Sequence, residues 1–343
     1  MRFLARILAV AAVAAVPACG GSGKPKVAIV TNCTANFWSI AEAGANKAAA
    51  EQNVDLTFRQ PPSLDVAQQK PIIDTLVQRG LAGIAISVIN PSEQTPDLKR
   101  IAGQTSMLTM DNDAPDSGRL AYIGIDNYEA GKAVGRLVKQ AMPEGGTLLL
   151  FIGATTSANA KARSGGVLDE LAGEKDAKGP LYGKFTLYKG EPITDGGDEA
   201  VALQNAKDHL GKLAEAKTPN LVAVGLYAYN PKAILSAAGK LGLVGKIKIV
   251  GFDEDDLTLE GIEKGEIVGT VVQDPFLYGY RSVEILAALA RGDRSKLNQP
   301  AIPYRVVTKD GGPEETVNGT PVKNLKAADF AKELKANLAS AKK

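Results

Sequence analysis

Short apolar runs alternate with longer amphipathic stretches along most of this chain. The apolar runs are four to six residues long and rich in valine, isoleucine and leucine, which is typical of β-strands. They lie at 27–30, 54–58, 84–88, 107–110, 122–125, 147–152, 185–188, 221–226, 247–252 and 267–272. Amphipathic segments such as 37–52 and 64–79 separate them. Since continuous apolar strands are buried on both faces, the pattern predicts an α/β protein with two parallel sheets covered by helices.

The first residues carry a different pattern, that of an export signal. Arg2 and Arg6 precede ten apolar residues at 7–16, and small residues lead into Cys19. Ten residues are too few for a membrane-spanning helix, which needs about 20. The segment resembles a lipobox, so we predict a lipoprotein signal peptide over 1–19, lipidation of Cys19, and a flexible tether over 20–25. The folded part is then expected outside the cytoplasm, periplasmic or extracytoplasmic, with a lipid anchor as its only membrane contact.

Charge and cysteine content narrow the classes of partner. The chain has 40 basic and 38 acidic residues, so removing Arg2 and Arg6 leaves 38 of each. A neutral mature chain does not attract a polyanion, which argues against nucleic acid. Cys33 is the one cysteine after Cys19, so neither a disulfide between unmodified thiols nor a cysteine metal cluster is expected. The length and the 45% apolar content suggest two domains.

Polar and aromatic residues follow most of the predicted strands. In open α/β sheets, ligands bind beyond the carboxyl ends of the strands. The residues at these positions are 31–32, 37–38, 111–113, 126–127, 155–163, 227–230, 253 and 273–274. A loop or helix cap explains any single one of them. Their recurrence at so many strand ends favours a ligand site.

Several of these motifs, in this order and spacing, resemble one protein family. They are Asn36-Phe37-Trp38 after the first strand, and the segments 110–115, 122–127, 159–163, 250–253 and 270–273. From Lys26 to about Lys309 the chain resembles the periplasmic sugar-binding proteins of ABC transporters, of the ribose-binding type. The resemblance implies a type I periplasmic binding protein fold: two doubly wound, Rossmann-like lobes joined by a three-strand hinge.

The resemblance also implies how the chain divides. The N-terminal lobe is expected over 26–125 plus 275–300, and the C-terminal lobe over 126–274 plus 301–325, with a tail at 326–343. The crossings between the lobes are expected near Ile125, Asp274 and Ile302. One sugar is expected in the cleft between the lobes, and members of the family usually act as monomers.

Carried over position by position, the resemblance implies a set of ligand-binding residues. They are Thr31, Asn32, Phe37, Trp38, Asp111, Asn112, Asn159, Lys161, Arg163, Tyr229, Asn230, Phe252, Asp253 and Gln273. The aromatic side chains would pack on C–H patches of a sugar, and the charged ones would bond its hydroxyl groups. Two alternatives stay open: either Lys161 or Arg163 reaches the sugar, and one of the residues in 227–230 lines the cleft.

Asn112 departs from the family pattern. Ribose-type members usually have arginine there, a strong multiple donor, whereas asparagine is shorter and neutral. Together with the neighbouring Asp113, this makes the strand end more acidic. The identity of the sugar is therefore open, and a hydroxyl-rich polyol or a cationic ligand becomes an alternative to a plain pentose.

We therefore expect an exported protein that captures a monosaccharide or polyol by hinge closure and delivers it to an ABC transporter permease. The alternative is a sensory or autoinducer-binding protein that presents a non-sugar ligand to a receptor. An enzyme is not expected. The 31–38 segment has no glycine-rich dinucleotide turn, and the only histidine, His209, lies in a helical pattern away from any strand end. The acidic run 253–256 does not match a calcium loop, and no cofactor or metal is expected.

Overall fold

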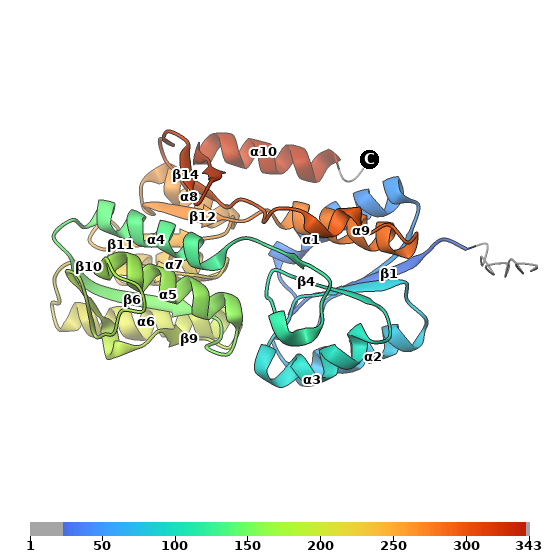
Figure 1. Ribbon diagram of the computed structural model, residues 1–343. Coiled ribbons are helices and arrows are strands. Elements are labelled where there is room, and N and C mark those ends of the chain that lie inside the picture. Colours follow the sequence, from blue (N-terminus) through green and yellow to red (C-terminus); the bar gives the residue numbers. More distant parts are fainter. Residues whose placement is uncertain (1–22, 341–343) are drawn as a thin grey trace, which may run out of the picture.

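The computed structural model describes residues 23–340, which form two α/β lobes lying side by side (Figure 1). The first lobe contains a five-stranded parallel sheet with the strand order β2-β1-β3-β4-β5. Its strands are β1 (Lys26–Val30), β2 (Asp55–Arg59), β3 (Gly83–Ile86), β4 (Ser106–Met110) and β5 (Tyr122–Ile123). Its helices are α1 (Asn36–Gln52), α2 (Val66–Gln78), α3 (Pro91–Ala102) and, later in the chain, α9 (Pro275–Ala290).

The second lobe is built on a larger sheet with the order β16-β13-β12-β11-β10-β6-β8-β7, and β9 pairs with β6. Its strands are β6 (Gly146–Ile152), β7 (Leu181–Tyr182), β8 (Phe185–Leu187), β9 (Ile193–Thr194), β10 (Leu221–Gly225), β11 (Lys248–Phe252), β12 (Gly269–Val272), β13 (Arg305–Thr308) and β16 (Asn324–Lys326). Its helices are α4 (Asn127–Ala141), α5 (Ala158–Ala172), α6 (Glu199–Glu215), α7 (Asn230–Lys240), α8 (Asp256–Lys264) and α10 (Ala327–Ser340). A separate hairpin joins β14 (Glu315–Val317) to β15 (Thr320–Val322).

The α/β class with parallel sheets is confirmed, and each predicted apolar run overlaps a strand. The last four residues of β1 are fully buried, as expected for a strand covered by helices on both faces. The second sheet departs from a purely parallel arrangement at its edges, where β13 pairs antiparallel with β12 and β7 pairs antiparallel with β8. Short edge strands such as β7 and β9 have too few residues for a readable apolar pattern.

Close packing against a neighbouring helix fixes the positions of α1 and α5, the two helices that begin at the face between the lobes. Helix α1 packs on α9, where a Cβ atom at Gly44 would lie 1.9 Å from the carbonyl oxygen of Phe276. Helix α5 packs on α4 in the same way, since a Cβ atom at Gly166 would lie 2.1 Å from the carbonyl oxygen of Tyr128. Any larger side chain would push these pairs apart. The glycines therefore fix where the first residues of α1 and α5 stand.

The chain passes between the lobes after β5, after β12 and before β13 (Figure 1). The backbone N–H of Ile302 donates to the carbonyl oxygen of Gly124 at 3.0 Å, which joins two of these crossings. The residues expected as a tail are ordered elements of the second lobe up to residue 340: Lys326 ends β16, and residues 327–340 form α10. This helix packs on the second lobe through the buried side chains of Ala327 and Phe330.

The predicted signal peptide, Cys19 and the first part of the predicted tether lie outside the described residues. Between residues 23 and 340, no helix combines the length and apolar character that crossing a membrane requires.

Candidate functional site

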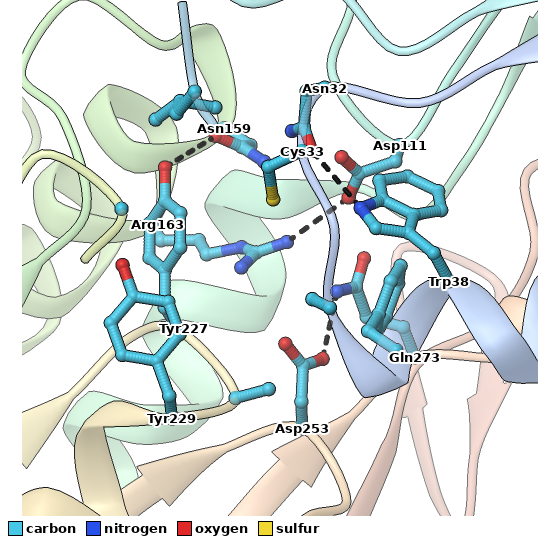
Figure 2. Close-up of a pocket in the computed structure, with 15 residues that line it drawn as sticks. Asn32, Cys33, Trp38, Asp111, Asn159, Arg163, Tyr227, Tyr229, Asp253 and Gln273 are labelled. Atoms are coloured by element: carbon cyan, nitrogen blue, oxygen red, sulfur yellow. Dashed lines mark hydrogen bonds and ion pairs between the residues drawn. The ribbon is translucent and has the colours of Figure 1, made fainter. Parts of the chain in front are cut away.

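A pocket lies between the lobes, where the carboxyl ends of strands from both sheets meet (Figure 2). It contains about 490 Å³ of empty space, a figure that includes its open mouth. The predicted residues that line it from the first lobe are Asn32, Phe37, Trp38 and Asp111. Those from the second lobe are Asn159, Arg163, Tyr229, Asp253 and Gln273.

The first lobe supplies an aromatic wall from the start of α1. Trp38 is 2% exposed, and its indole N–H donates to Oδ1 of Asn32 at 3.1 Å, which fixes the orientation of the indole ring. Phe37 packs edge-on against it, with 4.9 Å between ring centroids. Because both residues begin a helix that is held against α9, their rings have fixed positions at the pocket.

Arg163 of α5 is the single cation among the described residues that line the pocket. It is 2% exposed, its Nε donates to Oδ1 of Asn127 at 2.7 Å, and its Nη1 donates to the carbonyl oxygen of Leu226 at 3.0 Å. The guanidinium carbon lies 3.9 Å from the ring centroid of Phe252. Its Nη2 has no hydrogen-bond partner among the described residues and points toward Asp111, whose Oδ1 is 3.9 Å away (Figure 2). One strong donor is thus buried, held in place and available to a ligand.

Two aspartates flank this guanidinium, one from each lobe. Asp111 follows β4 and Asp253 follows β11, and both have a left-handed backbone, with φ of 59° and 67°. Aspartate tolerates this conformation better than most residues because its short side chain can hydrogen-bond locally. Oδ2 of Asp111 accepts from Oγ of Ser87 at 3.0 Å, and Oδ1 of Asp253 accepts from Nε2 of Gln273 at 2.8 Å.

Burial governs the protonation of both carboxyls. Loss of solvent raises the pKa of Asp111, and the positive charge of Arg163 opposes this shift. Burial likewise raises the pKa of Asp253 to about 6, again opposed by Arg163. Two carboxyls and one guanidinium therefore share the pocket, and they can accept from and donate to hydroxyl groups.

A pair of tyrosines forms the wall on the side of the second lobe. Tyr229 donates through its hydroxyl to Oδ1 of Asp195 at 2.6 Å, while Nδ2 of Asn230 donates to the other oxygen of the same carboxylate at 2.8 Å. The hydroxyl of Tyr227 donates to Oδ1 of Asn159 at 3.3 Å. Since the Tyr229 hydroxyl is already bonded, this residue offers its ring to the pocket.

Five predicted residues lie outside the pocket lining. Thr31 and Phe252 are fully buried; the Thr31 hydroxyl donates to the carbonyl oxygen of Cys33, and the Phe252 ring packs against the Arg163 guanidinium. The Asn230 side chain stabilises the loop before it, because its Oδ1 accepts a hydrogen bond from the backbone N–H of Tyr227 at 3.1 Å. Lys161 is exposed, so Arg163 is the basic residue that faces the pocket. Asn112 is buried behind the lining.

The lining also includes residues that were not predicted. They are Cys33, Ala35, Leu64 and Gly197, while Tyr227 and Ala228 come from the 227–230 segment, in which one lining residue was expected, and line the pocket together with Tyr229. Cys33 and Ala35 lie in the loop after β1, and Tyr227 and Ala228 lie in the loop after β10, so strand-end position was the available signal for these four. Burial raises the pKa of the Cys33 thiol to about 11, which keeps it neutral. Leu64 and Gly197 come from loops of opposite lobes that reach the pocket, and no local sequence pattern predicts this.

Two lobes, three crossings and a pocket between the lobes are the features of a solute receptor. The chain matches the family model described as a periplasmic binding protein domain over residues 27–294, so it belongs to the periplasmic binding protein family. This is a family of solute-binding proteins and not of enzymes.

Curated relatives and solved structures extend the likeness over most of the chain. The ribose import binding protein of Salmonella typhimurium is 23% identical over 307 residues, covering 88% of this chain and 96% of the relative. The xylitol-binding protein of Mycolicibacterium smegmatis is 22% identical over 322 residues, covering 90% and 87%. An ABC transporter solute-binding protein from Burkholderia graminis, solved in complex with D-arabinose, has a TM-score of 0.76 and 26% identity, covering 84% of this chain and 97% of that one.

Proposed function

We propose that this protein captures a monosaccharide or polyol in the interlobe pocket and delivers it to an ABC transporter permease. The observation that carries the proposal is the state of Arg163. Its Nη2 is buried, has no hydrogen-bond partner among the described residues, and lies between two carboxyls that come from different lobes. A buried donor without a hydrogen bond is costly, so a ligand that accepts from it gains affinity.

The chemistry of the lining favours a polyhydroxylated ligand. Asp111 and Asp253 can accept hydrogen bonds from hydroxyl groups, and Arg163 can donate a hydrogen bond to a hydroxyl or ring oxygen. The rings of Trp38 and Tyr229 offer apolar faces from opposite lobes, which suit the C–H patches of a sugar. The names of the relatives, which bind ribose, xylitol and D-arabinose, agree with this class.

Closure of the lobes around the ligand supplies the mechanism. A ligand that contacts both lobes binds the closed arrangement better than the open one, and this difference shifts the population toward closure. The crossings after β5, after β12 and before β13 provide the hinge. The closed form is then what the permease recognises, with the protein acting as a monomer anchored through lipidated Cys19.

A thermal-shift screen against pentoses, hexoses, polyols and cyclitols tests the proposal. A ligand at about 100 times its dissociation constant adds roughly 2.7 kcal/mol to the free energy of unfolding. Trp38 is the only tryptophan and lines the pocket, so its fluorescence gives a second titration of the same event. Stabilisation by one sugar or polyol class, with a matching fluorescence change, supports the proposal. Folded, ligand-free protein that responds to none of them would exclude this ligand class and favour a non-sugar signal.

A further inference from the structure

Asn112 joins the two lobes directly, although it lies outside the pocket lining. It follows Asp111 at the end of β4 in the first lobe and is fully buried. Its Oδ1 accepts a hydrogen bond at 2.9 Å from the backbone N–H of Asn159 in the second lobe. Its Nδ2 donates to the carbonyl oxygen of Val88 within the first lobe, which fixes the amide orientation.

The bonded N–H group belongs to the first turn of α5. The first backbone N–H groups of a helix have no partner inside the helix, and a side chain just before the helix usually accepts from one of them. Ser157 occupies that capping position, yet its side chain makes no capping bond among the described residues. Its Oγ donates instead to the carbonyl oxygen of Ile89 in the first lobe, at 3.2 Å.

We propose that Asn112 acts as an N-terminal cap of α5 supplied by the opposite lobe, and that it sets ligand affinity without touching the ligand. This rests on the proposed function, because closure of the lobes is what brings cap and helix together. Helix α5 carries Asn159 and Arg163, and Asn112 is covalently next to Asp111. The bond therefore positions the pocket residues of the second lobe against the carboxylate of the first.

Opening the lobes breaks this bond and frees Ser157. The N–H of Asn159 then loses its acceptor, and Ser157 loses its bond to Ile89. Serine is among the preferred capping residues, so Ser157 can cap α5 from its own position in the open form. The helix end thus has one cap in the closed form and another in the open form, and the closing equilibrium depends on which is stronger.

Two substitutions, one in each lobe, test the proposal. Asn112→Ala removes the cap from the first lobe, and Ser157→Asp strengthens the local cap while placing a carboxylate against the Ile89 carbonyl oxygen. Both are expected to weaken D-arabinose binding about 3- to 10-fold in Trp38 fluorescence titrations, the range of one or two hydrogen bonds. Ser157→Asp is expected to do so without lowering the melting temperature, since it improves the helix cap. Asn205→Ala, which removes an amide–carbonyl bond inside the second lobe, serves as the control.

Small-angle scattering of the ligand-free proteins gives an independent arm. Both variants are expected to have a larger radius of gyration than the wild type and than Asn205→Ala. Unchanged D-arabinose affinity in both variants would overturn the proposal. If no sugar binds the wild type, the proposed function fails and scattering alone decides: ligand-free curves that superimpose for all four proteins count against the cap, and expanded variants support it.

Discussion

The two lobes present the same element in different surroundings. In each, a buried strand ends at an aspartate with a left-handed backbone, Asp111 in the first lobe and Asp253 in the second. Asp111 is held by Ser87 of its own lobe and turns its second oxygen toward Arg163 of the other. Asp253 is held by Gln273, at the end of the strand that leads into a crossing between the lobes.

The difference is that only the second lobe brings a cation to the pocket lining. The first lobe brings an aromatic pair and one carboxylate, and the second brings Arg163, Asp253 and a tyrosine wall. Neither lobe alone offers a hydroxyl-rich ligand both a strong donor and two aromatic walls. The proposed site therefore needs residues of both lobes, and substitutions in the two lobes are expected to have unequal effects.

Replacing Arg163 tests the unequal contribution most directly. Arg163→Met removes the cation and leaves Asp111 and Asp253 buried without it. Breaking a buried charge pair costs about 3–5 kcal/mol, so we expect sugar binding to be lost and the melting temperature to fall. Isothermal titration calorimetry and thermal unfolding measure the two effects. Lys161→Met on the same helix is the matched control, because Lys161 is exposed and outside the pocket, and its affinity should equal that of the wild type. Equal affinities in both variants would contradict the assignment of Arg163.

Replacing Asp111 is expected to have a smaller effect. Asp111→Ala removes a single charged acceptor and should weaken binding by about 1–3 kcal/mol. It also leaves Arg163 with Asp253 as its remaining anionic neighbour in the lining, so the loss should be smaller than for Arg163→Met. Asp116→Ala provides the control, since Asp116 is exposed in the loop that follows the same strand. An affinity for Asp111→Ala equal to that of the control would remove Asp111 from the site.

Much of this arrangement could be predicted from the sequence. The apolar runs predicted the strands, and central strands such as β3 and β10 are buried along their whole length. Strand-end position placed Trp38, Asp111, Arg163 and Asp253 near one site, and all four line the pocket. Strand-end position also explains why Asn112 was expected in the lining, since it directly follows Asp111. Its side chain instead bonds across the lobes, because the amide matches a helix N–H on one side and a carbonyl oxygen on the other.

The rest depends on contacts between distant segments, which no local pattern encodes. Leu64 and Gly197 meet at the pocket from different lobes: a Cβ atom at Gly197 would lie 2.9 Å from Cβ of Leu64. Likewise, the bond from Tyr229 to Asp195 joins loops that are 34 residues apart. Helix α10 was expected as a tail, and its docking depends on the second sheet having an edge strand, β16, beside it.

A third effect, on stability and not on binding, separates the tyrosine wall from the aromatic pair of the first lobe by its dependence on pH. Burial raises the pKa of Asp195 from 3.8 to about 6, while the hydrogen bonds from Tyr229 and Asn230 oppose the shift. Between these two pH values the folded protein binds more protons than the unfolded chain, so the free energy of unfolding falls as the pH rises from about 4 to about 6. Asp253 and Glu254, whose pKa values are also raised by burial, add to this slope.

Asp195→Asn should reduce this fall in the free energy of unfolding by up to about 3 kcal/mol, the equivalent of two pKa units. Tyr229→Phe removes a donor that stabilises the Asp195 carboxylate and should move the end of the fall to higher pH. Urea unfolding at pH 4, 5, 6 and 7 measures both. Phe37→Leu, in the aromatic pair of the first lobe, is the control and should keep the wild-type slope, because Phe37 contacts Trp38 and Tyr278 and not Asp195. A slope altered by Phe37→Leu as much as by Asp195→Asn would show that the two walls are not energetically separate.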